Sequence, residues 1–368
     1  MKDERRKVYI HLNYYQDAAS YRQRYDACQE PDKTPYGYHH LEAWGYHLTF
    51  SSSQKESKIV NLLRRAGNRF VGFDLWHAWR NRKRMGGVEA ILTYSEKEHL
   101  AILLLRKLGI APPSPLLIAQ SVWLFSTWEQ LPRWKQKLYR WLIQDDARTV
   151  LTVQSDENLK VARSLFPDMR SEWLRFGISV DSFPLKPPTP VYTQRTRPLR
   201  LLSLGNDKHR DWETLIEAVK GNKDVELRIA TSQRLQSSIG DCNRILVKPA
   251  RSLGEIHELY RWADVVVVPT RPNKHVSGIT VILEGVANGK PIIATDTGGL
   301  KGYFGDDEIY YVPPQSTEAL AVAVERIGED EDTLSRAKNA QAKLLAAELT
   351  TKGLASRHVA LLEDLLSS

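Results

Sequence analysis

The sequence predicts an α/β protein with two domains, each a parallel sheet covered by helices. The chain has 368 residues, of which 42% are apolar. A single hydrophobic core usually stops growing at about 250–300 residues, so this length favours two domains with a cleft between them. Short β-branched runs also alternate with helical patterns through both halves, which is typical of parallel α/β sheets. A proline-rich stretch, residues 185–198, separates the halves and is interpreted as a linker.

In the first half, residues 1–184, six short apolar runs predict strands. Between them, three amphipathic stretches predict helices, and Ser95 and Ser155 stand where helix N-caps are expected. The expected strands are Val8–Asn13, Tyr46–Ser51, Ala90–Tyr94, Leu116–Gln120, Val150–Gln154 and Glu172–Phe176, and the helices Glu96–Leu108, Trp134–Asp145 and Asp156–Leu165.

The second half, residues 199–350, restarts with the same alternation and predicts a Rossmann-like domain. Residues 351–368 are expected to form a final helix that could cross back to the N-terminal domain. The expected strands are Leu199–Ser203, Val225–Ala230, Arg244–Val247, Val265–Pro269, Pro291–Thr295 and Glu308–Val312, and the helices Trp212–Val219, Leu253–Trp262 and Thr280–Asn288.

The window from Ala263 to Leu300 carries the chemistry. A buried strand ends in a loop with Ser277 and Gly278, and this loop opens into an apolar helix. Unpaired N–H groups at a helix N-terminus can bind a diphosphate, here over the amides of Gly278, Ile279 and Thr280. About one turn further on, Glu284 could accept hydrogen bonds from a ribose diol.

This window resembles the nucleotide-sugar site of retaining GT-B glycosyltransferases of family 4, the glycosyl transferases of group 1. Their pattern runs E-G-F-G-x-x-x-x-E-A-M-A-x-G-x-P-V-x-x-x-D-x-G-G. The segments Ala287–Pro291 and Asp296-x-Gly-Gly match it in order and spacing. The resemblance implies a GT-B fold, a nucleotide-sugar donor domain at 199–350 and an acceptor domain at 1–184, with Glu284 on the ribose.

A second stretch, Leu199 to Val219, is similar to the family segment that binds the donor phosphates. Gly205 aligns with the family glycine, Asn206 takes the place of its arginine, and Arg210 takes the place of its lysine. The resemblance therefore implies that Arg210, with Lys208 as second choice, offsets the charge of the departing nucleoside diphosphate. A solvated loop is the alternative reading for both cations.

One family residue is missing, and this leaves the stereochemistry open. The glutamate that contacts the donor sugar falls at Val276, or at His275 with a slip of one residue. We expect a UDP- or GDP-sugar, transfer with retention and a saccharide or lipid-linked acceptor in polysaccharide or glycolipid biosynthesis. An inverting enzyme and a non-catalytic GT-B subunit are the alternatives. An inverting enzyme needs a base, for which Asp17 is the first candidate and His39, His40 or Glu42 the next.

Charge and aromatic content give the remaining expectations. The formal charge is +8, and residues 1–190 hold 29 Lys and Arg against 20 Asp and Glu. The basic segments around 76–84 and 134–141, each predicted to lie on one helix, also carry tryptophans. A peripheral contact with an anionic inner membrane face is one interpretation, and a solvated basic face with core tryptophans is the other. No nucleic-acid-binding signature accompanies the charge. No Asp-x-Asp follows a strand, so no metal or other cofactor is expected, and the lack of a long apolar run predicts a cytoplasmic protein.

Overall fold

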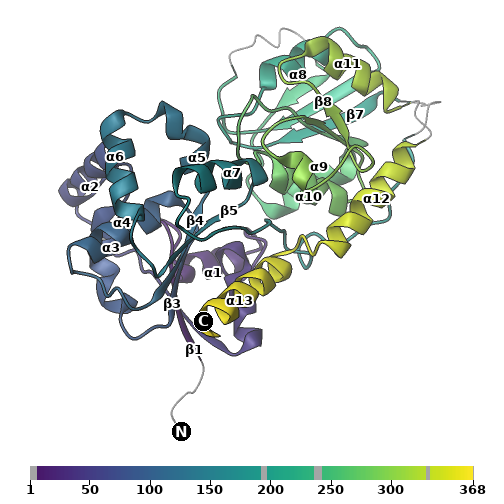
Figure 1. Ribbon diagram of the computed structural model, residues 1–368. Helices are drawn as coiled ribbons and strands as arrows, with labels where there is room; N and C mark the ends of the chain where they lie inside the picture. Colours follow the sequence, from purple (N-terminus) through teal and green to yellow (C-terminus); the bar gives the residue numbers. More distant parts are fainter. Residues whose placement is uncertain (1–5, 192–196, 236–242, 329–331, 368) are drawn as a thin grey trace. The chain divides into compact units, whose positions relative to one another are not determined.

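The structure, a computed structural model, describes residues 6–191, 197–235, 243–328 and 332–367. It divides into two compact units (Figure 1). Unit 1 comprises Met1–Asp26, Lys33–Arg175 and Leu354–Ser368, and unit 2 comprises Ala27–Asp32 and Phe176–Gly353. The proline-rich stretch 185–198 belongs to unit 2 in this division, and its residues 192–196 lie outside the described part of the chain.

Unit 1 is built on a six-stranded parallel sheet in the order β2-β1-β3-β4-β5-β6. Figure 1 shows α4 on one side of this sheet and α1 and α13 on the other. The strands are β1 (Arg6–His11), β2 (Tyr46–Phe50), β3 (Ala90–Thr93), β4 (Leu116–Ser121), β5 (Thr149–Val153) and β6 (Ser171–Trp173). The helices are α1 (Ala18–Asp26), η1 (Pro35–Trp44), α2 (Lys58–Val71), α3 (Leu75–Asn81), η2 (Arg82–Met85), α4 (Glu96–Lys107), α5 (Leu124–Thr127), η3 (Trp128–Gln130), α6 (Arg133–Ile143), α7 (Asp156–Leu165) and most of α13 (Thr351–Ser367).

Unit 2 repeats this architecture with a second six-stranded parallel sheet, in the order β12-β11-β10-β7-β8-β9. Trp212 and Leu215 pack on the same core as Leu320 and Val324, which joins α8 and α11 over one face of the sheet. The strands are β7 (Leu199–Leu204), β8 (Val225–Ala230), β9 (Ile245–Val247), β10 (Val265–Val268), β11 (Ile292–Thr295) and β12 (Tyr310–Val312). The helices are α8 (Trp212–Val219), α9 (Leu253–Trp262), α10 (Ile279–Ala287), η4 (Leu300–Gly302), α11 (Thr317–Arg326) and α12 (Thr333–Ala346).

The predicted α/β fold class is confirmed, because both sheets are parallel and every expected strand is found close to its predicted position. Ser95 and Ser155 cap α4 and α7, and Ser95 forms a capping box with Glu98. The single helix expected around residues 76–84 is wrong, since α3 ends at Asn81 and a 3-10 turn follows. Helix α2 had no prediction. None of the helices in the described ranges is both long and apolar enough to span a bilayer.

Candidate functional site

The order of strands in unit 2 places two loops side by side. The first strand, β7, lies between β8 and β10, so the connections after β7 and after β10 leave the sheet in opposite directions. Ligands of open parallel sheets bind at such a switch point, beyond the carboxyl ends of the strands. The loop after β7 holds Gly205 to Asp211, and the loop after β10 leads to Gly278. Arg210 bridges to Thr270 across the two loops.

Arg210 is the most unusual residue of this switch point. Its side chain is only 4% exposed, and among the described residues no hydrogen-bond acceptor reaches Nε or Nη1. Burial lowers the pKa of the guanidinium to about 10, opposed by the nearby charge of Asp207. A buried cation whose N–H donors have no acceptor destabilises the folded protein unless an anion binds to it. The site is therefore suited to a negatively charged ligand.

Two glycines make room for this guanidinium. A Cβ on Gly205 would lie 2.5 Å from Arg210 Nε, and a Cβ on Gly278 would lie 2.7 Å from Nη1. Both glycines have positive φ, at 138° and 91°, which other residues rarely adopt. Gly278 is also the N-cap of α10. The sequence-predicted residues Gly205, Arg210 and Gly278 are thus brought together at one place.

The first turn of α10 agrees with only part of the prediction. The N–H of Ile279 donates to the carbonyl of Val276 at 3.1 Å, so this amide is already used. Thr280 is exposed, whereas Ser277 is buried and donates its hydroxyl to Asp207 Oδ2. Ser277 therefore organises the loop from within and does not present its hydroxyl to solvent.

Glu284 lies one turn into α10, and its carboxylate belongs to the same cluster as Arg210. Tyr260 of α9 donates its hydroxyl to Glu284 Oε2 at 2.7 Å. Burial raises the pKa of Glu284 to about 7, although the Tyr260 hydrogen bond and the charge of Arg210 act in the opposite direction. The carboxyl group therefore titrates near neutral pH, and Tyr260 is a site residue that the sequence did not single out.

A second group of side chains, around Asp207, braces the two loops. His275 Nε2 and His209 Nδ1 each lie 3.3 Å from an oxygen of Asp207, and Ser277 contacts the same carboxylate. Despite burial, these hydrogen bonds hold the pKa of Asp207 well below its usual range. Asp207, His209 and His275 offer ligand atoms within 4.8 Å of one another, a donor set that suits a divalent cation. The hydrogen bonds account for the cluster without one.

Two other predicted residues of the first loop have different surroundings. Asn206 Oδ1 accepts from the N–H and the hydroxyl of Ser232 at 2.7 and 2.8 Å, so this side chain ties the loop after β7 to the loop after β8. Lys208 is exposed. Of the two cations in the segment, Arg210 is the one that the fold buries at the switch point.

The Asp296–Gly299 turn serves a packing role in this structure. A Cβ on Gly298 would lie 2.1 Å from the carbonyl oxygen of His275, and Gly298 has a φ of 69°. Thr297 Oγ1 accepts from the N–H of Asn273 and donates to its carbonyl. Gly298 thus lets the turn approach the loop that precedes α10.

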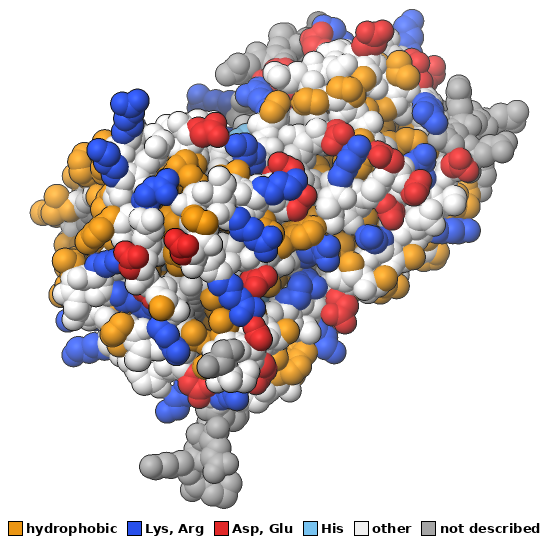
Figure 2. All heavy atoms as spheres, in the orientation of Figure 1, with side chains coloured by type: hydrophobic (Ala, Val, Ile, Leu, Met, Phe, Trp, Pro, Cys, Tyr) orange, Lys and Arg blue, Asp and Glu red, His pale blue; other side chains and the backbone are white. Residues whose placement is uncertain are grey.

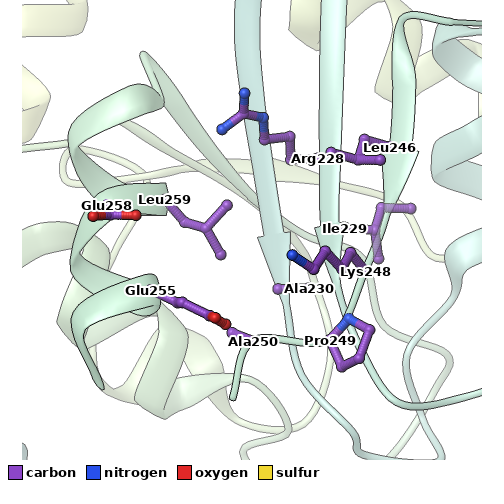
Figure 3. A pocket seen from close by; sticks show the side chains of 10 residues that line it. All are labelled: Arg228, Ile229, Ala230, Leu246, Lys248, Pro249, Ala250, Glu255, Glu258 and Leu259. Carbon is purple, nitrogen blue, oxygen red and sulfur yellow. The ribbon is translucent and has the colours of Figure 1, made fainter. Parts of the chain in front are cut away.

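A hollow of about 290 Å³ opens beside the carboxyl ends of β8 and β9 and the start of α9 (Figure 3). Apolar atoms of Ile229, Leu246 and Pro249 line it together with charged groups, among them Lys248 and Glu255. Lys248 donates its backbone N–H to Ile229 and thereby continues the sheet. The sequence contained no motif that marked this hollow, because its walls come from three separate elements.

In unit 1, the first candidate for a catalytic base has a structural role. Asp17 accepts the N–H and the hydroxyl of Ser20 at 3.1 and 2.6 Å, which caps α1. Glu96 accepts the N–H groups of Val122 and Trp123, both at 3.2 Å, and so joins the segments after β3 and β4. His39, His40 and Glu42 lie in η1.

A buried histidine pair at the carboxyl end of β1 was missed in the sequence. The rings of His11 and His77 stack with centroids 5.0 Å apart, and His77 Nε2 lies 3.1 Å from the carbonyl oxygen of Leu12. Burial lowers the pKa of both imidazoles, and this favours their neutral forms. His11 of β1 and His77 of α3 are 66 residues apart in the sequence and meet only in the folded chain, so no local signal could have revealed the pair.

Comparison with known proteins agrees with this geometry. Residues 199–330, which hold every predicted donor-site residue, match the family described as Glycosyl transferases group 1. No relative was found among the curated proteins.

Solved structures match over almost the entire chain. Sucrose-phosphate synthase from Thermosynechococcus elongatus has a TM-score of 0.71 at 17% identity, with 98% of this chain and 100% of that chain covered. Anabaena Alr3699/HepE in complex with UDP-glucose has a TM-score of 0.66 at 13% identity, with 97% and 99% covered. The α,α-trehalose 6-phosphate synthase from Burkholderia multivorans has a TM-score of 0.65 at 13% identity, with 99% of both chains covered.

These likenesses establish the GT-B fold, in which two such α/β units are joined in one chain. The match of segment 199–330 to the glycosyl transferases of group 1 identifies the class of enzyme as a glycosyltransferase. The expected class of enzyme is thereby confirmed.

Proposed function

We propose that this enzyme transfers a hexosyl residue from a UDP- or GDP-sugar to a hydroxyl group of a saccharide or lipid-linked saccharide, with retention. The observation that carries the donor site is the buried Arg210 guanidinium between Gly205 and Gly278. The oxygens of a diphosphate placed there would accept hydrogen bonds from Nε and Nη1. The diphosphate would also lie at the N-terminus of α10, where the helix dipole favours negative charge. As the glycosidic bond breaks, charge builds on the diphosphate, and a preorganised cation stabilises that charge.

The rest of the nucleotide extends from this diphosphate toward α9. Glu284, on the α9 side of the cluster, would accept hydrogen bonds from the ribose diol. The hollow beside Lys248 and Pro249 would take the base. UDP is the first nucleotide to test, because Alr3699/HepE, which shares the fold, has been solved with UDP-glucose. The cations and amides at hand supply the positive charge that a metal ion would otherwise contribute, so we propose catalysis without one.

The role of Asp17 in unit 1 favours retention over inversion. Asp17, the first candidate for a general base, is used to cap α1. In a retaining transfer the departing diphosphate can itself accept the proton of the acceptor hydroxyl. For the setting, we propose polysaccharide or glycolipid assembly in the cytoplasm at the inner face of the membrane, because basic, tryptophan-bearing segments lie in unit 1.

A donor panel tests the proposal. The purified enzyme is incubated with UDP- and GDP-sugars, and slow donor hydrolysis is followed by release of the nucleotide. We expect one UDP-sugar to be hydrolysed fastest, and Glu284→Ala to reduce that rate about 10- to 100-fold, because a group that binds the donor is lost. Glu217→Ala, on the exposed face of α8, is the matched control and should keep the wild-type rate.

Two results would count against the proposal. Nucleotide binding without hydrolysis or transfer across the panel would point to the non-catalytic alternative. A product whose anomeric configuration, read by NMR, is opposite to that of the donor would establish inversion and overturn the proposed retention.

A further inference from the structure

Helix α2 of unit 1 is amphipathic, but its apolar stripe faces solvent instead of the core. Its apolar side chains point to solvent: Ile59, Leu62, Leu63 and Phe70 are 72%, 69%, 66% and 68% exposed. Their spacing of three, four and seven residues places them on one face. A surface helix normally turns that face to the core, so the pattern requires an explanation.

The face of α2 that points inward carries a buried cation as well as Val71, which packs on the core. Arg64 is buried, and its guanidinium donates to Asp74 at 2.6 Å and to Glu56 at 2.9 Å. It also lies over the ring of Tyr14, 3.9 Å from the centroid. The ion pairs fix the rotation of α2 about its axis, because turning the apolar face inward would separate Arg64 from both carboxylates. The outward apolar face is therefore built into the fold.

The exposed face of α2 continues onto neighbouring elements. Phe70 stacks on Trp134 of α6 with ring centroids 5.1 Å apart, and Trp76 stacks on Trp79 of α3 at 5.0 Å. A hollow of about 520 Å³, with mainly apolar walls, lies between α2 and α3 and reaches the loop after α4. We call this surface the α2 face, and it comprises Ile59, Leu62, Leu63, Phe70, Trp76, Trp79, Leu108, Ile110 and Trp134.

The charge around the α2 face has one sign. Residues 58–85 contain eight Lys and Arg and a single acid, Asp74, which is paired inward with Arg64. Arg82 lies 4.2 Å from the ring of Trp79, and Lys135 lies 5.5 Å from the ring of Trp134. Figure 2 shows Lys and Arg next to hydrophobic side chains on the part of unit 1 where Figure 1 places α2 and α6.

We propose that the α2 face docks unit 1 on a bilayer surface rich in anionic phospholipid. Exposed apolar and tryptophan side chains would enter the headgroup region, and the surrounding cations would bind lipid phosphates. A second copy of the chain on the same face would bring two sets of cations together, which is unfavourable. The proposal deepens the membrane setting in the proposed function, and it depends on that function only for the purpose of docking.

The test is co-flotation of the full chain with vesicles of phosphatidylcholine alone or mixed with phosphatidylglycerol. We expect binding to the mixed vesicles, a blue shift of tryptophan emission on binding, and weaker binding at high salt. The double variant Leu62→Ser with Leu63→Ser removes two apolar contacts, and Arg65→Glu with Arg69→Glu reverses two exposed charges. Each should weaken binding about tenfold or more.

Matched controls lie in unit 2. Val322→Ser with Leu345→Ser removes two exposed apolar side chains, and Lys338→Glu reverses an exposed charge; both should bind vesicles as the wild type does. Donor hydrolysis is measured on every variant, so that loss of docking and loss of the proposed activity are separated. Equal binding by wild type and both α2 variants would overturn the proposal. So would variants that bind vesicles normally but abolish a concentration-dependent dimer, because the α2 face would then be an interface between copies.

Discussion

Replacing Arg210 with methionine should separate catalysis from stability. The side chains have similar length, but methionine carries no charge. In the absence of donor, burial lowers the pKa of Arg210 to about 10, and this lowering corresponds to a cost of about 3 kcal/mol for keeping the cation in the folded protein. Arg210→Met removes this cost, so we expect the free energy of unfolding of the donor-free enzyme to rise by up to about 3 kcal/mol.

The same substitution should reduce donor hydrolysis strongly. Removing one preorganised group that stabilises transition-state charge typically costs about 100- to 1000-fold in kcat. Urea unfolding measures the first effect and nucleotide release the second. UDP should also raise the melting temperature of the wild type and leave that of the variant almost unchanged.

The loop after β10 offers a matched control. Arg271 lies in the loop after β10, and its exposed guanidinium pairs with Glu213 at 2.9 Å. Arg271→Met removes this cation. We expect this variant to hydrolyse the donor normally and to change in stability by less than about 1 kcal/mol. Two results would refute the proposal that buried Arg210 binds the donor diphosphate. One is hydrolysis by the Arg210→Met variant at the wild-type rate, and the other is a clear loss of stability of this variant in the absence of donor.

Three further predictions concern the same site. Because the pKa of Glu284 is raised to about 7, its carboxylate is lost as pH falls below 7, so KM for the donor should rise between pH 8 and pH 6; Glu284→Gln should remove this dependence. Gly278→Ala places a Cβ 2.4 Å from Val268 Cγ1 at a φ of 91° and should cost about 1–3 kcal/mol of stability together with nucleotide binding, whereas Gly221→Ala, with open space around it, should change neither. Treatment with EDTA should leave donor hydrolysis unchanged, and lost activity restored by one divalent ion would assign a metal to Asp207, His209 and His275.

The sequence alone determined the fold class and the class of enzyme. Both depend on local signals: strands of β-branched residues repeat along the chain, and the segment from Ala263 to Leu300 keeps the order of a strand, a glycine loop, a helix with Glu284 and a glycine turn. Such signals survive in a single sequence because strand and helix periodicity, and the need for glycine at positive φ, act over a few residues.

The tertiary structure decided which candidate side chains meet. Arg210 and Lys208 were alternatives in the sequence, and the fold buries only Arg210, between glycines 73 residues apart. Asn206 and Asp17, both expected in the site, are used to tie a loop and to cap a helix. Tyr260 entered the site through its hydrogen bond to Glu284. Contacts of this kind join separate elements, so no periodicity or motif spacing encodes them.

The orientation of α2 on the surface of unit 1 was also decided by the tertiary structure. Sequence reasoning did not predict α2; in the structure its Ile59, Leu62, Leu63 and Phe70 form an apolar stripe, and such a stripe ordinarily faces the core. Here the buried ion pairs of Arg64 with Asp74 and Glu56 turn the stripe to solvent. Which side of this amphipathic helix is buried is thus determined by partners that other segments of the chain supply, and the residues of the helix alone do not reveal them.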